Sequence, residues 1–233
     1  MHKIIVLTIK SRFGDMESVI HPVVLKDEEH MVLIDCGYTG FLPALEQAAA
    51  DNNLTFEELT HVLITHQDHD HIGALAALKQ KYPKLQVVAG EKEASYISGQ
   101  LKSLRLEQAE ALQKNLPEEQ KAFGLAFCDI LKKVQPAAVD IMVRDGDVFD
   151  WCGGCTVLET PGHTPGHISL YVNQEKILIT GDAAALEDNQ LVIANPLYTL
   201  DIKEAEESLN KILNYGAKEI ICYHGGTYLP YEE

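Results

Sequence analysis

The chain has 233 residues, of which 46% are hydrophobic and 23% charged, a composition typical of a globular domain rather than of a disordered segment. Asp and Glu number 35 against 19 Lys and Arg, and the formal net charge of −16 argues against nucleic acid or an anionic membrane as the main partner. The five cysteines are scattered, which is not the pattern of a secreted disulfide framework. No apolar run approaches the roughly 18 residues of a membrane span, so we expect a cytoplasmic protein.

Alternating or continuous apolar runs and helical spacing predict the first half of the fold. In chain order, the predicted elements are strands at 3–9, 19–25 and 31–36, a helix at 41–50, a short helix begun by the capping box Thr55–Glu58, a strand at 61–65, a helix at 72–81 and a strand at 87–90.

Residues 92–134 interrupt this order with apolar positions at helical spacing, which predicts a helical insertion. Strands are expected to return after it, and an amphipathic helix follows at 202–215. The strands predicted there are 141–144, 147–151, 155–160, 168–172, 176–180 and 219–222. No repeat or linker divides the chain, so we expect residues 1–233 to form a single domain with a sheet-on-sheet core and helices outside.

Metal-ligating side chains are concentrated on turns that follow these strands. Thr65-His66-Gln67-Asp68-His69-Asp70-His71-Ile72-Gly73 comes directly after the apolar run Val62–Ile64. Three later turns each add one candidate ligand, namely His163, Asp182 and His224. Imidazoles and carboxylates gathered on turns in this way are typical of a metal centre.

These four motifs, in this order, resemble the metallo-β-lactamase superfamily. The hallmark Thr-His-x-His-x-Asp-His-x-x-Gly begins at Thr65, although Ala74 stands at the last position and Gly73 precedes it. The early Asp35-Cys36-Gly37 also looks like a turn of that family. The resemblance implies an α+β fold, the four-layer αβ/βα sandwich. It also implies two divalent ions, one held by His66, Asp68 and His163 and the other by Asp70, His71 and His224, with Asp182 bridging them.

Asp68 is the departure from the hallmark, which has histidine there. His69 is one residue later, and a shift of one residue points a side chain elsewhere, so we expect Asp68 to be the ligand and keep His69 as the alternative. A carboxylate favours hard ions, whereas the general order of affinities favours zinc. Zinc is therefore the first expectation, with iron or manganese as alternatives.

The resemblance implies a hydrolase in which a bridging hydroxide attacks an ester, thioester, lactone or phosphoester, with Asp70 as the catalytic residue that orients or accepts a proton. The alternative is an iron-dependent oxidoreductase or dioxygenase of the same superfamily, which Asp68 motivates. A non-catalytic binding protein is a third hypothesis, weakened by ligating residues at every expected position. Either enzyme would act on a small-molecule substrate.

Other features carry weaker predictions. Tyr198 and Tyr228 are candidates for binding substrate, and the insertion either forms a lid, with Leu101, Leu104 and Phe123 as contacts, or simply packs on the sheet. Glyoxalase-II-type thioesterases have a basic C-terminal extension, whereas the sequence runs only nine residues beyond His224, which speaks against that branch.

Two further histidines and one cysteine motif have other predicted roles. His167 is expected to support the ligands or pack rather than bind metal, and His21 is a weak candidate to approach the site. Trp151-Cys152-Gly153-Gly154-Cys155 resembles a redox motif, but a strand follows it rather than a helix, which favours a hairpin turn.

Overall fold

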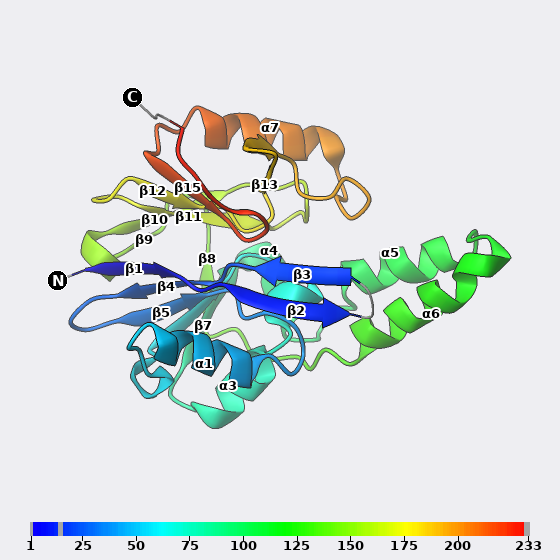
Figure 1. Ribbon diagram of the computed structural model, residues 1–233, viewed down its shortest axis with the longest axis horizontal. Coiled ribbons are helices and arrows are strands. Elements are labelled where there is room, and N and C mark those ends of the chain that lie inside the picture. Colours follow the sequence, from blue (N-terminus) through cyan, green and yellow to red (C-terminus); the bar gives the residue numbers. More distant parts are fainter. Residues whose placement is uncertain (1, 14–15, 231–233) are drawn as a thin grey trace.

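Two six-stranded sheets lie face to face with helices on both outer sides, in the computed structural model of the protein (Figure 1). The structure describes residues 2–13 and 16–230. Helices α1 and α3 cover one outer face and α7 covers the other. This arrangement is the expected α+β, four-layer αβ/βα sandwich.

The first sheet combines an antiparallel edge with a parallel half. Its strands, in spatial order, are β1 (Lys3–Val6), β4 (Val23–Lys26), β5 (Met31–Ile34), β6 (His61–Ile64), β7 (Gln86–Gly90) and β8 (Ile141–Val143). Strands β5 to β8 are parallel, so their carboxyl ends meet at one edge of the sheet. Helices α1 (Leu42–Asp51) and α3 (Leu75–Lys81) belong to the crossovers between these strands.

The second sheet contains strands β16 (Gly226–Tyr228), β15 (Glu219–Cys222), β12 (Ile177–Ile179), β11 (Ile168–Val172), β10 (Cys155–Glu159) and β9 (Val148–Phe149). Its one parallel pair, β12 with β15, is joined through helix α7 (Ile202–Leu213). The side chain of Asp201 begins this helix by accepting a hydrogen bond of 3.0 Å from the backbone N–H of Glu204.

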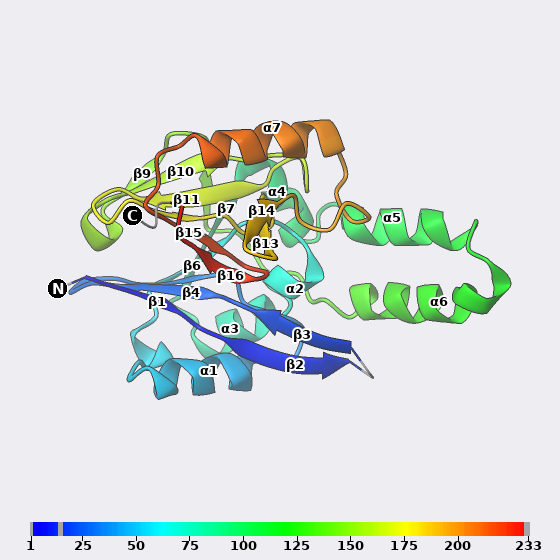
Figure 2. The same cartoon turned by 45° about the horizontal axis from the view of Figure 1, so that its top comes forward.

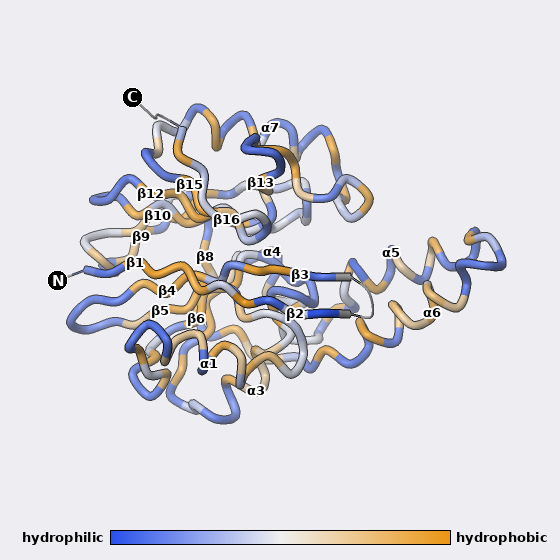
Figure 3. Tube along the Cα trace, viewed as in Figure 1, coloured by the Kyte–Doolittle hydropathy of each residue, from blue (hydrophilic) through white to orange (hydrophobic). Residues whose placement is uncertain are grey.

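The strand alternation divides the core into layers. On β5, Val32 and Ile34 pack between the sheets, whereas Met31 and Leu33 pack against the helices. Both faces of this central strand are therefore apolar, which is why its sequence reads as a continuous apolar run. Figure 3 shows the same distribution, with hydrophobic stretches following the central strands.

The region after β7 is largely helical, as the insertion at 92–134 predicts. It contains α4 (Glu91–Ile97), α5 (Leu104–Gln113) and α6 (Glu118–Lys132). Helices α5 and α6 form a hairpin that projects away from the sheets (Figure 2). The hairpin has a small hydrophobic core of its own, formed by Ala109, Cys128 and Leu131.

Several short elements differ from the sequence predictions. The hairpins β2 (Ile9–Phe13) with β3 (Met16–Ile20) and β13 (Ala185–Glu187) with β14 (Gln190–Val192) were not predicted, nor was β16. The predicted strand at 19–25 is two strands, because Pro22 has no N–H to continue a ladder. Such short, partly exposed strands carry little periodic signal.

Candidate metal centre

The loop that leaves β6 carries the first of the predicted ligands. Strand β6 ends at Ile64, and the four-residue helix α2 (His69–Ile72) begins with Asp68 as its N-cap. Gly73 allows the turn to sit against a neighbouring loop, because a Cβ there would lie 2.2 Å from the backbone nitrogen of Thr39. The close approach falls on Gly73, whereas the buried Ala74 fits where the hallmark has glycine.

The fold brings the seven predicted ligands together, although they are spread over the chain. Their donor atoms form three groups, and within each group all the atoms lie within 4.8 Å of one another. These groups are His66–Asp68–His163, His66–His71–Asp182 and Asp70–His71–His224.

Asp182 lies between the group that contains His163 and the group that contains His224. Its Oδ1 is 3.4 Å from His71 Nε2 and 3.6 Å from His224 Nε2. Its Oδ2 is 3.5 Å from His163 Nε2. One carboxylate oxygen therefore faces each side of the centre, as a bridging ligand requires.

The donor set fits divalent ions. Buried atoms of the cluster without a hydrogen-bond partner include His66 Nε2, His71 Nε2 and Asp182 Oδ1, and these three residues form one of the groups of donor atoms. Buried polar atoms in native structures are nearly always paired, so unpaired lone pairs converging on one space indicate that cations belong there. Nitrogen and oxygen donors of this kind suit zinc, iron or manganese.

Asp68, and not His69, belongs to this cluster. Asp68 Oδ2 lies 3.1 Å from His163 Nε2 and 3.5 Å from His66 Nε2. The His69 ring packs edge-on against Tyr38 and Phe127, with centroids 5.5 Å away in both cases, and His69 joins none of the ligand groups found in residues 2–13 and 16–230. The geometry favours Asp68 as the ligand.

Asp35 orients two of the histidines, a role that the sequence did not reveal. Its Oδ2 lies 2.8 Å from His71 Nδ1 and accepts from the hydroxyl of Thr65 at 2.8 Å. An ionised carboxylate only accepts, so His71 carries its proton on Nδ1 and Nε2 is free to bind metal. The Thr65 hydroxyl, already donating to Asp35, accepts at 3.1 Å from His66 Nδ1, which frees His66 Nε2 as well.

Tyr223 fixes the turn that carries Asp70. Its hydroxyl donates to the Asp70 carbonyl at 2.6 Å and accepts from the Gly37 N–H at 3.1 Å. Its ring lies 4.0 Å from the ring of His71. One buried side chain thereby holds the backbone of one ligand and the imidazole of the next.

Glu93 and His167 join the ligand loops to one another. Glu93 accepts from the backbone N–H of Gln67 at 3.0 Å and from that of Gly166 at 2.9 Å, so it ties the first loop to the loop of His163. Burial raises the pKa of Glu93 against the opposing effect of its hydrogen bonds. His167 accepts from the Asp182 N–H at 3.0 Å through Nε2, so it holds the backbone of the residue that is predicted to bridge the ions.

Arg105 is a further participant that the sequence analysis missed. It lies in the first turn of α5 and is 2% exposed. Its Nη2 is 2.5 Å and its Nε 3.0 Å from Asp68 Oδ2. An arginine at helical spacing in a polar segment carries no local sign of such a contact.

Charge balance explains the ionisation of the cluster. Burial alone raises the pKa of Asp68, but the charge of Arg105 and the neighbouring imidazoles of His163 and His66 hold this pKa well below its usual range. Burial lowers the pKa of His71, and the carboxylates of Asp182, Asp35 and Asp70 outweigh it and raise the pKa well above its usual value. The same carboxylates would attract a divalent ion in place of that proton.

A cavity of about 550 Å³ opens onto the cluster. One wall is formed by five of the predicted ligands and the other by apolar side chains of α6, which are Phe123, Ala126, Phe127 and Ile130. Tyr198 lines the cavity and its ring covers Arg105, whereas Tyr228 lies on β16 and is not among the lining residues. Of the predicted insertion contacts, Phe123 lines this cavity and Leu101 and Leu104 do not.

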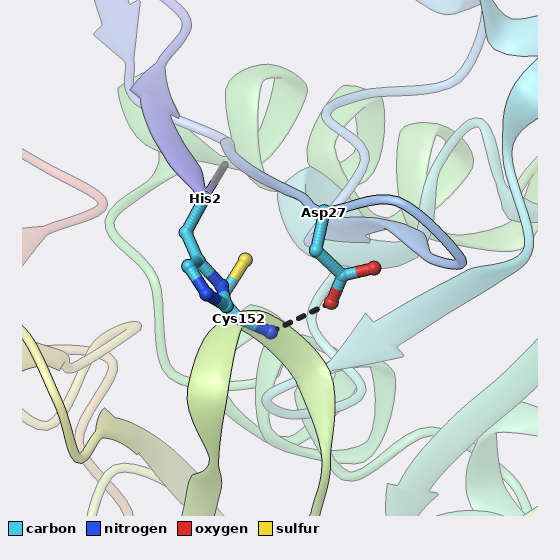
Figure 4. Close-up of side chains that lie close together, drawn as sticks. All are labelled: His2, Asp27 and Cys152. Atoms are coloured by element: carbon cyan, nitrogen blue, oxygen red, sulfur yellow. Dashed lines mark hydrogen bonds between the residues drawn. The ribbon is translucent and has the colours of Figure 1, made fainter.

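His21 does not reach the ligand groups of the described residues, although its ring approaches Gly226 beside His224. A separate group, His2, Asp27 and Cys152, also brings three donor atoms together (Figure 4). Asp27 accepts there from the backbone N–H of Cys152 at 2.8 Å, and its other oxygen caps the turn at His30. These bonds account for Asp27 as a structural residue.

The two cysteines of the Cys-x-x-Cys motif are not activated. They lie at a hairpin, since β9 pairs with β10 on either side of a short 3-10 turn, Trp151–Gly153. Both are buried, and burial raises the pKa of Cys152 to about 11 and that of Cys155 further. A redox motif needs a lowered thiol pKa, so the hairpin interpretation holds.

Two facing sheets between helices, with imidazoles and carboxylates gathered at the strand ends, define a metal-binding sandwich protein. The chain matches the model of the metallo-beta-lactamase superfamily over residues 18–224, and it belongs to that superfamily. No helix of the described residues is long and apolar enough to cross a membrane.

Several relatives are similar over much of the chain. It is 27% identical over 220 residues to the probable metallo-hydrolase YflN of Bacillus subtilis, covering 88% of this chain and 80% of that protein. It is 30% identical to the metallo-beta-lactamase fold-containing protein ST1585 of Sulfurisphaera tokodaii, covering 89% and 73%. The hydroxyacylglutathione hydrolase GloC of Haemophilus influenzae is 29% identical over 162 residues, covering 69% of this chain and 64% of GloC.

Solved structures show the same fold. The metallo-beta-lactamase family protein TTHA1429 of Thermus thermophilus superimposes with a TM-score of 0.75 at 23% identity, covering 97% of this chain and 75% of that one. The relatives also include the hydroxyacylglutathione hydrolase of Rhizobium meliloti, which is 29% identical over 126 residues, covering 54% of this chain and 34% of that protein.

Proposed function

We propose that the protein is a dinuclear metal-dependent hydrolase that cleaves an ester, thioester, lactone or phosphoester in a small molecule. The observation that carries the proposal is the position of Asp182, with one carboxylate oxygen toward His71 and the other toward His163. Relatives named as metallo-hydrolases support the reaction class.

Each ion would have its own set of ligands. His66, Asp68 and His163 would hold the first, Asp70, His71 and His224 would hold the second, and Asp182 would be shared. When bound, such ions lower the pKa of water toward neutrality and polarise the carbonyl or phosphoryl oxygen of the substrate. The protein then needs no covalent nucleophile.

Asp70 is the proposed catalytic residue. Its Oδ2 lies 3.3 Å from His224 Nε2, whereas its Oδ1 is 3.4 Å from His69 Nδ1, and the residue lines the cavity. Burial raises its pKa, but the surrounding histidines, His69 foremost, hold the pKa well below its usual value. The carboxylate is therefore ionised and able to orient a water or accept its proton.

The cavity favours a substrate with an apolar part. Phe127 packs against Tyr198 with ring centroids 5.9 Å apart, and together with Phe123 these rings form an aromatic wall opposite the ligands. A scissile group at the metal centre would leave the rest of the molecule against this wall. The helical insertion therefore serves as a wall of the substrate site.

The test is a substrate screen with defined metal content. The chelator-treated protein is loaded with zinc, manganese or iron(II) and tested on p-nitrophenyl esters, thioesters, lactones and phosphodiesters. We expect Asp182→Asn to lower turnover by at least about 100-fold, while the exposed Asp129→Asn has no effect. Full metal content and full turnover in Asp182→Asn would contradict the shared-ligand scheme.

The second candidate is an iron-dependent oxidoreductase, and Asp68 is the observation that favours it, since a carboxylate suits iron. The contact with Arg105 weakens this argument, because it neutralises the added charge. Metal analysis of protein from rich medium separates the two: two zinc ions per chain support hydrolysis, and bound iron with oxygen consumption supports the alternative.

A further inference from the structure

Arg105 reaches from the insertion into the candidate metal centre. It lies in the first turn of α5, and three of its contacts fix it there: Asp68 through Nε and Nη2, and the carbonyl of Tyr198 through Nη1. Because five donors of a guanidinium are rigidly placed, these contacts define the orientation of its charge.

The guanidinium contacts two of the proposed ligands of the first ion. Its Nη2 lies 3.3 Å from His163 Nε2 and 2.5 Å from Asp68 Oδ2. Asp68 Oδ1 is buried and has no hydrogen-bond partner. The oxygen that contacts the arginine, Oδ2, is also the one that lies 3.1 Å from His163 Nε2 and 3.5 Å from His66 Nε2, so the guanidinium charge lies directly beside the first metal position.

The two metal positions differ in charge as a result. At the first, Arg105 cancels the charge of Asp68, which leaves the position electrostatically similar to one with three histidines. At the second, Asp70 has only histidines among the charged partners found in residues 2–13 and 16–230. A nearby fixed cation repels a divalent ion, and burial strengthens that repulsion.

We propose that Arg105 is the counter-ion of Asp68 and makes the two metal positions unequal, so that the Asp70–His71–His224 position fills first. The first position then binds a divalent ion at least about tenfold more weakly, and Arg105 sets the difference. Arg105 is a positioning residue in this account, and the inference rests on the proposed metal centre. It also gives a reason for Asp68, since a histidine beside a fixed guanidinium would lack the negative charge that offsets it.

The experiment measures zinc binding rather than activity. The metal-free full chain is titrated with zinc in competition with a chromophoric chelator, and bound zinc is counted by elemental analysis. The wild-type protein should bind one zinc tightly and a second at least about tenfold more weakly. In Arg105→Gln the weaker step should tighten by about tenfold or more while the tight step stays within about threefold.

Three further variants separate charge from packing. Arg105→Lys keeps the charge, so its second step should stay weak, and Arg144→Gln removes an arginine from an exposed pair with Glu91 as the matched control. Asp68→His should lose the weaker step, and the double variant Asp68→His/Arg105→Gln should regain it. This rescue keeps the inference testable should Arg105→Gln alone fail to fold, which thermal unfolding would reveal.

The outcomes separate this inference from the proposed function. Two equal zinc sites in the wild-type protein, or unchanged binding in Arg105→Gln, would overturn the role of Arg105 and leave the dinuclear centre standing. Tightening in Arg105→Lys equal to that in Arg105→Gln would overturn the electrostatic explanation. A wild-type chain that binds no zinc, manganese or iron would overturn the proposed function itself.

Discussion

Replacing Asp35 by asparagine tests whether the buried carboxylate controls the proton on His71. Asp35 is 1% exposed and accepts three hydrogen bonds, from the Thr65 N–H at 2.9 Å, the Thr65 hydroxyl at 2.8 Å and His71 Nδ1 at 2.8 Å. Asparagine has one oxygen to offer these donors and brings an NH₂ group of its own.

The better orientation of the amide keeps its oxygen at the Thr65 N–H, because a backbone donor cannot turn away. The NH₂ group then faces the hydroxyl, which can rotate to accept, and His71 Nδ1. His71 can accept only by moving its proton to Nε2, the atom that faces Asp182 at 3.4 Å. A protonated Nε2 cannot bind a metal ion.

The expected cost follows from this proton transfer. Changes to groups that orient a ligating histidine lower metal affinity by roughly 10- to 100-fold, which is about 1.4–2.7 kcal/mol. Zinc affinity is measured by competition with a chelator, and unfolding in urea reports stability separately. Asp140→Asn is the matched control, because Asp140 also accepts from a backbone N–H, that of Val87, in the same sheet. Unchanged zinc affinity in Asp35→Asn would refute the reasoning.

Three further predictions concern other parts of the structure. Burial raises the pKa of Cys152 to about 11, so at pH 7.5 this thiol and that of Cys155 are protonated, and iodoacetamide should modify them only after denaturation; rapid labelling of the folded protein would revive the redox interpretation. Gly162→Ala should lower the free energy of unfolding by at least about 2 kcal/mol, because its φ is +125° and a Cβ would lie 2.2 Å from the backbone nitrogen of Ala205; an unchanged urea midpoint would contradict this. Glu93→Gln should cost about 1–3 kcal/mol, since one amide oxygen cannot accept from both ligand loops, and a melting temperature equal to that of the wild type would argue against this brace.

The sequence by itself determined the layers and predicted the set of ligands. Apolar runs such as β5 must be buried on both faces, and the strand and helix periods therefore predict a sheet-on-sheet core between helices. The ligand-bearing turns are recognisable because each follows a buried strand and contains residues that bind metal. The geometry favours the same seven side chains that the motif order predicts.

Only the tertiary structure decided which groups surround these ligands. Arg105 is 37 residues from Asp68 in the sequence, and Tyr223 is 153 residues from Asp70, so neither contact leaves a local pattern. The choice between Asp68 and His69 likewise depends on where a short helix begins after β6. Periodicity reports which face of an element is buried, whereas a hydrogen bond between distant segments depends on how those segments pack, and that is fixed only when the whole chain has folded.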